Sequence, residues 1–324
     1  MDNRYNYVFY NFFEDYYQPI ALPLDKLPFV KVYGYAFKAN KFLQKLFILH
    51  WSAKINRWIK LPLKRLWFKK MIQGNFDNSK PCCYVFLTGK YILEDERLYK
   101  YIKSLNPDNK AVVLCGDLIS KKNWDMQNVN SMCDMVLTYD RGEAEKYDIE
   151  FYPWEDIYGA IEEVTTPAEF ETDVYFLGFA KDRLEDIHNA YKVFSEAGLR
   201  CKFIICGTQE KDRVQGEGLY YTAPISYREN LRNVNNSRCI LEVIQGGSCA
   251  PTLRLREACT YKRKLISNNT NPVYREQLDC ENLFVYSDAS EVDPGFAKAP
   301  IAYEGFTEVA QDPMRFIGYL EKQL

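Results

Sequence analysis

Short apolar runs alternate with amphipathic segments along most of the chain. In the first half, the pattern predicts strands over 5–10, 30–35, 83–87, 111–115 and 135–138, and helices over 41–60, 94–104 and 142–146. In the second half, it predicts strands over 173–178, 201–207, 239–244 and 264–267, and helices over 182–198 and 227–237. Strands that alternate with helices predict parallel sheets covered by helices, which is an α/β fold.

A linker is predicted between two domains. The run 156–171 is rich in acids and threonines and contains Pro167, which is typical of a connecting segment. We therefore expect a first domain over 1–155, a linker over 156–172 and a second domain over 173–324, whose last helix could pack back on the first domain. A chain of 324 residues suits two domains better than one.

Basic side chains follow a glycine at the end of one predicted strand. The stretch FLGFAKDR places Lys181 and Arg183 just after Gly178, where the chain turns from strand to helix. Glycine lets the backbone approach a ligand, and the helix start offers free N–H groups to phosphate oxygens, which lysine and arginine also bind. The alternative is an ordinary strand-to-helix turn that carries two basic residues.

A second turn of this kind, at 245–248, follows another predicted strand and contains two glycines. Thr252 is placed to cap a helix that carries Arg254 and Glu257. The positive end of the helix favours a diphosphate, Arg254 can add a bidentate contact, and Glu257 can accept hydrogen bonds from ribose hydroxyls. Alternatively, the glycines only make a turn, and Glu257 forms a structural ion pair with Arg254 or Lys264.

Both turns lie at strand ends in the same half of the chain, so they would face one edge of a sheet, where such sheets bind ligands. Two cationic turns on one edge suit a ligand with a nucleotide and a diphosphate. The candidate binding residues are Gly178, Lys181, Arg183, Gln245, Gly246, Thr252, Arg254 and Glu257.

The charge distribution singles out one basic segment. Residues 38–70 contain eight lysines, two arginines and no acid, which leaves the rest of the chain at −12 for a net charge of −2. Its longest uncharged run, 46–53, is far shorter than the ~18 residues that span a bilayer, and Pro62 divides the segment. A basic, aromatic, amphipathic segment is typical of a helix that lies on an anionic membrane surface. The candidate membrane contacts are Lys45, Trp51, Lys54, Arg57, Trp58, Lys64, Arg65 and Trp67.

Two other interpretations of this segment remain, a surface helix packed on its own domain and a nucleic-acid contact. The acidic remainder of the chain argues against nucleic acid as a partner. The ten cysteines form no Cys-x-x-Cys pair and only two histidines are present, so a zinc site is not expected. The first residues, MDNR, do not resemble a signal peptide, and scattered cysteines then predict reduced thiols in the cytoplasm.

Several motifs, in this order and spacing, resemble a known family. They are VVLCGDLI, CDMVLTYDRGEAEKYDIEFYPW, DVYFLGFAKDRL, ISYRENL, SRCILEVIQGG and TLRLREACTYKRKLISNN. Together they resemble bacterial glycosyltransferases of lipopolysaccharide and capsular polysaccharide biosynthesis, over residues 80–267. The resemblance implies the GT-B fold, in which two Rossmann-like domains with parallel sheets face a central cleft.

The resemblance also implies that the two domains bind different substrates. The second domain would bind a nucleotide-sugar donor, with Gly178, Lys181 and Arg183 near its diphosphate and the residues of the second turn and helix lining its pocket. The first domain would bind the acceptor, a glycan or lipid-linked oligosaccharide.

The chain departs from the family pattern at the catalytic positions. Retaining GT-B enzymes carry two glutamates separated by seven residues, but Cys249 stands eight positions before Glu257. No Asp-x-Asp triplet is present, and EDE at 94–96 is better explained as an acidic helix start. This favours a reaction without metal or other cofactor, in which cations and helix dipoles stabilise the leaving diphosphate.

An inverting reaction also needs a base that faces the acceptor. Asp117 and Asp140 follow predicted strands of the first domain and are the candidate catalytic residues, although each could instead cap a helix. His50 and His188 are expected to be structural or surface groups.

These expectations together describe a cytoplasmic hexosyl- or deoxyhexosyltransferase of cell-surface polysaccharide synthesis, peripheral at the inner face of the membrane. One alternative is a GT-B-like sugar-nucleotide epimerase, which would need neither acceptor nor membrane. The other is a non-catalytic scaffold of a polysaccharide assembly complex, which would need no donor.

Overall fold

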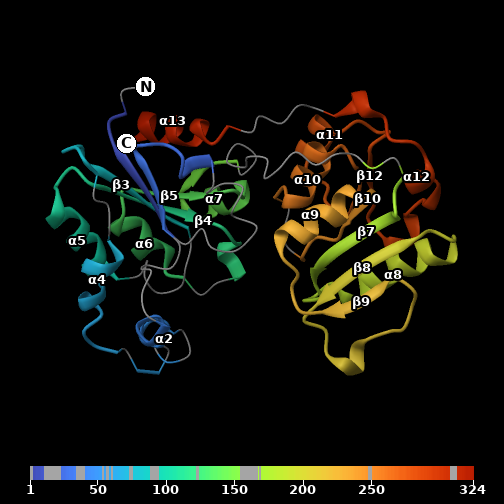
Figure 1. Cartoon of the computed structure of the whole chain (residues 1–324), viewed down its shortest axis with the longest axis horizontal. Coiled ribbons are helices and arrows are strands. Elements are labelled where there is room, and N and C mark those ends of the chain that lie inside the picture. The colour runs from blue at the N-terminus through green and yellow to red at the C-terminus, as the bar shows by residue number, and fades with distance from the viewer. Residues whose placement is uncertain are drawn as a thin grey trace. The chain divides into compact units, whose positions relative to one another are not determined.

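The chain forms two compact units, each built on one six-stranded parallel sheet (Figure 1). The first unit comprises Met1–Ile161 and Gln311–Leu324, and the second comprises Glu162–Ala310. The α/β class and the two Rossmann-like sheets expected from the sequence are thereby confirmed. The computed structural model describes residues 3–10, 23–33, 41–52, 55, 58–59, 61–72, 76–87, 95–121, 124–153, 167, 169–246, 250–306 and 312–324.

The first sheet has the strand order β2-β1-β3-β4-β5-β6, with every neighbouring pair parallel. Its strands β1, β3 and β5 are buried along their whole length, which explains their nearly continuous apolar sequences. The strands are β1 Asn6–Tyr10, β2 Val30–Tyr33, β3 Cys82–Leu87, β4 Lys110–Cys115, β5 Met135–Thr138 and β6 Glu150–Phe151.

Helices cover both faces of this sheet. On one face, Phe68 and Ile102 pack in a core shared with β3 and β4. On the other face, the ring of Phe316 lies 6.2 Å from that of Phe9 and 5.0 Å from that of Tyr152. The helices are α2 Lys41–His50, α4 Arg65–Met71, α5 Glu96–Leu105, α6 Met126–Met132, α7 Arg141–Tyr147 and α13 Met314–Gln323.

Helix α13, at the end of the chain, packs in the first unit rather than the second. The Glu321 carboxylate accepts hydrogen bonds from the backbone N–H of Arg4, at 3.0 Å, and from the hydroxyl of Tyr7, at 2.9 Å. The Tyr319 hydroxyl lies 3.4 Å from the carboxylate of Glu150. These contacts connect α13 to both β1 and β6.

The basic segment does not form the single helix predicted over 41–60. Helix α2 ends at His50, and the chain folds back so that α4 packs against it. The Trp67 indole donates to Nδ1 of His50 at 2.8 Å, and Nε2 of His50 lies 2.6 Å from the carbonyl oxygen of Pro62. Burial of these aromatic rings against the first unit outweighs continuation of the helix.

The second sheet has the order β12-β11-β10-β7-β8-β9, again with all neighbours parallel. Renumbered from its first strand, this is the 3-2-1-4-5-6 order of dinucleotide-binding folds. The strands are β7 Thr172–Phe179, β8 Cys201–Cys206, β9 Leu219–Thr222, β10 Ser237–Glu242, β11 Lys264–Ser267 and β12 Leu283–Val285. Thr172, assigned above to the linker, is the first residue of β7.

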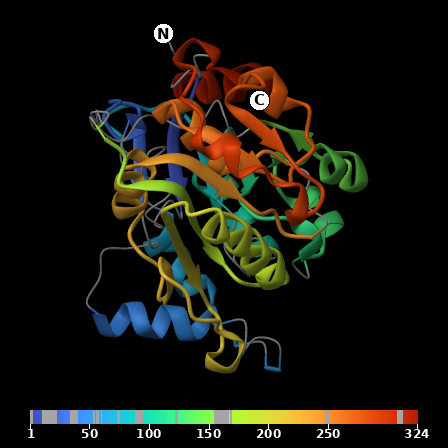
Figure 2. The same cartoon turned by 90° about the vertical axis from the view of Figure 1, so that its right-hand side faces the viewer.

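Helices cover both faces of the second sheet as well (Figures 1 and 2). Phe194 of α8 and Ala297 of α12 belong to the core on one face. Val234 of α9, Leu255 of α10 and Tyr274 of α11 belong to the core on the other. The helices are α8 Leu184–Glu196, α9 Tyr227–Asn235, α10 Leu253–Tyr261, α11 Val273–Gln277 and α12 Pro294–Lys298.

We predict that Glu321→Ala destabilises the first unit by about 1–3 kcal/mol, because the fully buried Tyr7 would lose the acceptor of its hydroxyl. The free energy of unfolding, measured by chemical denaturation, checks this. Lys322→Ala changes an exposed neighbour in the same helix and should stay within about 0.5 kcal/mol of the wild type. Equal stabilities of the two variants would contradict the role of Glu321.

Candidate functional site

The strand order of the second sheet reverses between β7 and β10. The chain leaves β7 for α8 on one face, and it leaves β10 for α10 on the opposite face. Doubly wound sheets bind their ligands at the carboxyl ends of the two strands where the order reverses. Gly178 lies at the carboxyl end of β7, and Gln245 and Gly246 follow β10, so the two predicted turns meet at this position.

Two arginines hold the ends of these strands. Arg183 donates from Nε to the carbonyl oxygen of Phe179, at 3.2 Å, and from Nη1 to the carbonyl oxygen of Val243. Arg254 donates from Nη2 to the carbonyl oxygen of Leu177, at 3.2 Å. Arg183 lies at the start of α8 and Arg254 in the first turn of α10, so two separate helix starts place guanidinium groups on the same strand ends.

The two guanidinium groups are close enough to affect one another. Burial lowers the pKa of Arg183, and the charge of Arg254 lowers it further. Burial alone would lower the pKa of Arg254, but the carboxylate of Glu257 raises it above its ordinary value. Both arginines remain protonated at neutral pH, so two cationic groups lie at the strand ends, and Arg254 is paired there with the carboxylate of Glu257.

Glu257 forms the ion pair with Arg254 that the sequence left as an alternative to ribose binding. One carboxylate oxygen pairs with Arg254 Nη1, and the other accepts from Asn230 Nδ2 at 2.8 Å. Glu257 is 1% exposed, so it offers no surface to a ribose. This corrects the expectation that Glu257 contacts the ligand, because burial beneath Arg254 leaves it only a positioning role.

The other predicted residues of the turns lie around the arginines. Exposed Lys181 adopts a left-handed backbone conformation, with φ of 45°, and its Nζ lies 3.0 Å from Oε1 of Gln245. A Cβ at Gly178 would lie 2.8 Å from Arg183 Nη2, so glycine makes room for that guanidinium. Gly246 is exposed, and the predicted turn residues 247 and 248 lie outside the described residues.

The start of α10 is anchored by a buried carboxylate that the sequence analysis missed. Thr252 caps the helix, as predicted, by accepting from the backbone N–H of Arg254 at 3.0 Å. The Thr252 hydroxyl also donates to Glu242, the last residue of β10, which accepts from Ser267 as well and from the Tyr274 hydroxyl at 2.9 Å. The signal in the sequence was an acidic residue within the apolar run CILEVI.

Glu242 is almost fully buried, and this burial raises its pKa although three hydroxyl donors favour the ionised form. No lysine or arginine is bonded to it in the described part of the second unit. Glu242 therefore fixes the relative positions of β10, β11 and the start of α10, which carries Arg254.

The candidate bases of the first unit have different surroundings. Asp140 is buried and caps α7 by accepting from the backbone N–H of Glu143 at 2.9 Å, so it has the structural role named above as its alternative. Asp117 follows β4 and is exposed. His188 lies on α8 with Nε2 2.8 Å from the Tyr221 hydroxyl, which is a structural contact within the second unit.

The basic segment separates into buried and exposed parts. Trp51, Lys64 and Trp67 are 6%, 9% and 8% exposed, and the Lys64 ammonium lies over the Trp51 ring at 4.7 Å. This corrects the expectation that these three contact a membrane, because they pack inside the first unit. Lys45, Trp58 and Arg65 are exposed, whereas Lys54 and Arg57 lie outside the described residues.

Exposed apolar side chains accompany these basic residues. Trp58 is 83% exposed, and its neighbours along the segment include several large aliphatic and aromatic side chains that face solvent. They are Phe42, Leu46, Leu49, Ile59, Leu63 and Leu66. Across the residues that the structure describes, no helix combines the length and apolar character needed to cross a bilayer.

Among the residues that the structure describes, His, Cys, Asp and Glu side chains nowhere gather in threes in a way that could hold an ion. The nine described cysteines are all free thiols.

No protein-family model matches the chain, and no curated protein has a matching sequence. Several solved structures are similar to it at low identity. A UDP-GlcNAc 2-epimerase from Neisseria meningitidis, bound to UDP-GlcNAc, is 9% identical with a TM-score of 0.49, and 98% of each chain is covered.

Two glucosyltransferases are also similar to the chain. A DNA-modifying β-glucosyltransferase, solved with and without uridine diphosphoglucose, is 11% identical with a TM-score of 0.44, covering 75% of this chain and 78% of that one. An α-glucosyltransferase in complex with UDP and a 13-mer DNA containing a HMU base is 8% identical with a TM-score of 0.45, covering 98% of this chain and 90% of that one.

We predict that Glu242→Gln removes a pH-dependent part of the stability. A folded-state pKa above the unfolded value means that the folded protein binds more protons, so the contribution of Glu242 to stability falls as pH rises from the unfolded pKa, about 4.5, to the folded one. The unfolding free energy of the wild type should therefore fall relative to that of the variant as pH rises across this window. Denaturation curves at several pH values measure it, and a difference that stays constant would contradict the raised pKa.

Proposed function

We propose that the chain is a glycosyltransferase that takes a hexose or deoxyhexose from a nucleoside diphosphate sugar bound at the carboxyl ends of β7 and β10. The observation that carries the proposal is the convergence of Arg183 and Arg254 on these neighbouring strand ends. Guanidinium groups bind diphosphate oxygens bidentately, and nucleotides bind at this point of doubly wound sheets. The proposal includes an acceptor glycan, carried on a lipid.

Transfer would break the bond between the sugar C1 and the diphosphate oxygen while the acceptor hydroxyl oxygen forms a new bond to C1. Negative charge then develops on the leaving diphosphate. Lys181, Arg183, Arg254 and the amides at the start of α10 would stabilise this charge, so we expect activity without added divalent metal. The acceptor proton would pass to a carboxylate of the first unit, and exposed Asp117 fits this role better than Asp140, which caps a helix.

We predict that Arg254→Ala weakens nucleotide-sugar binding more than tenfold, which corresponds to about 1.4 kcal/mol or more. Isothermal titration with UDP-, GDP- and dTDP-sugars measures the affinity. The exposed Arg275→Ala on α11 is the matched control and should leave the affinity unchanged. Unchanged affinity in Arg254→Ala would remove this arginine from the site.

A second variant separates binding from folding, because Arg254→Ala also leaves the buried Glu257 carboxylate without its partner. In Arg254→Met combined with Glu257→Gln, the amide oxygen can still accept from Asn230 and no unpaired charge is buried. This double variant should recover much of the lost stability but none of the lost affinity. Recovery of both would show that Arg254 acts only through folding.

We also propose that the protein works at the cytoplasmic face of the membrane, where a lipid-linked acceptor would be found. Support comes from the exposed part of the basic segment, where Lys45, Arg65 and Lys69 accompany exposed Trp58 and Leu66. Basic side chains attract anionic headgroups, and exposed apolar side chains can enter the boundary with the acyl chains.

Replacement of Lys45, Arg65 and Lys69 by glutamine should weaken binding to vesicles that contain phosphatidylserine by at least tenfold. Each basic residue near an anionic surface contributes about 1 kcal/mol, so three exceed this threshold together. The control replaces three exposed lysines elsewhere, Lys100, Lys192 and Lys211, which gives the same change in net charge. Equal losses in both variants, measured by vesicle co-sedimentation, would contradict a specific membrane surface.

A further inference from the structure

The second unit contains a cavity at the amino edge of its sheet, the edge opposite the proposed donor site. Its volume is about 430 Å³. It is lined by residues near the beginnings of three neighbouring strands. Phe170 lies two positions before β7, Arg200 lies directly before β8, and Arg238 is the second residue of β10. Because β10 has six residues, the cavity and the carboxyl ends of the strands are roughly 20 Å apart. The remaining walls are Glu169, Pro300, Ile301 and Tyr303.

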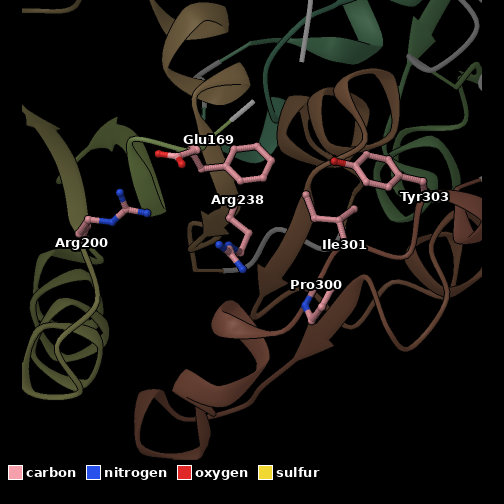
Figure 3. A pocket seen from close by; sticks show the side chains of 7 residues that line it. Glu169, Arg200, Arg238, Pro300, Ile301 and Tyr303 are labelled. Atoms are coloured by element: carbon pink, nitrogen blue, oxygen red, sulfur yellow. The ribbon is translucent and has the colours of Figure 1, made fainter. Parts of the chain in front are cut away.

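Arg238 lines the cavity and has no ion pair among the described residues, so its guanidinium could bind an anion. Its Nη1 donates to the carbonyl oxygen of Lys298 at 2.8 Å, but its buried Nε has no hydrogen-bond partner among the described residues. Arg200, by contrast, forms a bidentate ion pair with Asp173, with contacts of 2.9 and 3.1 Å. Figure 3 shows the guanidinium of Arg238 between Glu169 and Arg200 on one side and Pro300 and Ile301 on the other.

Two further cations lie behind the wall of the cavity. Arg263 is fully buried, and its guanidinium lies over the ring of Phe170 at 5.0 Å, while that of Arg238 lies over the same ring at 5.7 Å. Arg263 donates only to oxygens of Lys262 and Asn235, and its Nε has no partner in the described part of the chain. Burial lowers the pKa of Arg263 to about 10, so it keeps its charge at neutral pH.

Lys264 completes the cluster. Its Nζ lies 3.4 Å from the carbonyl oxygens of Ala299 and Pro300 and 4.1 Å from the centre of the Phe296 ring. Among the described residues, neither Arg238, Arg263 nor Lys264 has a hydrogen bond or ion pair with a carboxylate. Buried positive charge without a bonded carboxylate costs free energy, and a bound anion would offset that cost.

The cavity also lies where the chain enters and leaves the second unit. Glu169 and Phe170 follow the entry at Glu162, and Ile301 and Tyr303 precede the exit at Ala310. A ligand in the cavity would therefore contact both connecting segments at once.

We propose that this cavity binds a small phosphorylated molecule, which holds the entering and leaving segments together and is distinct from the proposed donor. Phosphate suits the site because its several oxygens can accept from the guanidinium of Arg238 and from the hydroxyl of Tyr303, which both line the cavity. Phe170, Pro300 and Ile301 supply the apolar wall for the organic part. The proposal does not rest on the glycosyltransferase assignment.

The test measures binding of inorganic phosphate and glucose 6-phosphate to the full chain by isothermal titration, with succinate as a carboxylate comparison. We expect glucose 6-phosphate to bind, and Arg238→Gln to weaken it at least tenfold, while Arg275→Gln on the exposed face of α11 leaves it unchanged. The double variant Arg254→Met, Glu257→Gln should also bind it normally, because that variant alters only the opposite edge.

Hydrogen exchange gives a second readout. Bound glucose 6-phosphate should slow amide exchange in 169–171 and 301–303, but not at the start of α10. If Arg238→Gln fails to fold, Arg238→Lys and Tyr303→Phe should each still weaken binding severalfold. Absence of binding in the millimolar range, equal affinity for succinate, binding that survives all three substitutions, or binding lost in the Arg254 double variant would each overturn the proposal.

Discussion

The second unit depends on how the carboxyl ends of β7 and β10 are held. The two strands are neighbours whose connections leave on opposite faces of the sheet. Arg183 and Arg254 donate to carbonyl oxygens at the ends of both strands. Burial of a guanidinium group costs free energy unless its N–H groups form hydrogen bonds. Here backbone carbonyl oxygens accept most of those hydrogen bonds. The groups that complete the fold are thus the same groups that give the strand ends their positive charge.

Two buried glutamates keep this arrangement in place by different means. Glu257 pairs directly with Arg254, whereas Glu242 acts through the hydroxyls of Thr252, Ser267 and Tyr274. Since Thr252 caps α10, the second network sets where the helix begins and therefore where Arg254 lies. A rigid supporting layer of this kind lets charged groups meet a ligand without rearrangement. At the opposite edge of the sheet, Arg238 and Arg263 lie beside Phe170 and have no bonded carboxylate among the described residues, which suits them to an anionic ligand.

Much of the fold could be predicted because its strands are apolar runs bounded by glycine or polar residues. The strands at 135–138 and 264–267 match their predicted limits. The ends of the other predicted strands differ from the observed ends by a few residues. The edge strands β6, β9 and β12 were missed, since these edge strands are short, are partly exposed and lack a continuous apolar run. The helix predicted over 41–60 was too long, because amphipathic periodicity does not reveal that Trp67 returns to pack against α2.

The α/β class, the division into two sheets and the position of glycine and basic residues at strand ends could be predicted from sequence, because each depends on local periodicity and local turn chemistry. The strand order that brings the two turns together, the ion pair of the buried Glu257 and the role of Glu242 became visible only in the folded chain. These depend on contacts between distant segments, such as Arg254 with the carbonyl of Leu177. Local patterns show which residues can donate a hydrogen bond or carry a charge, whereas the packing of distant elements decides which partner each one meets.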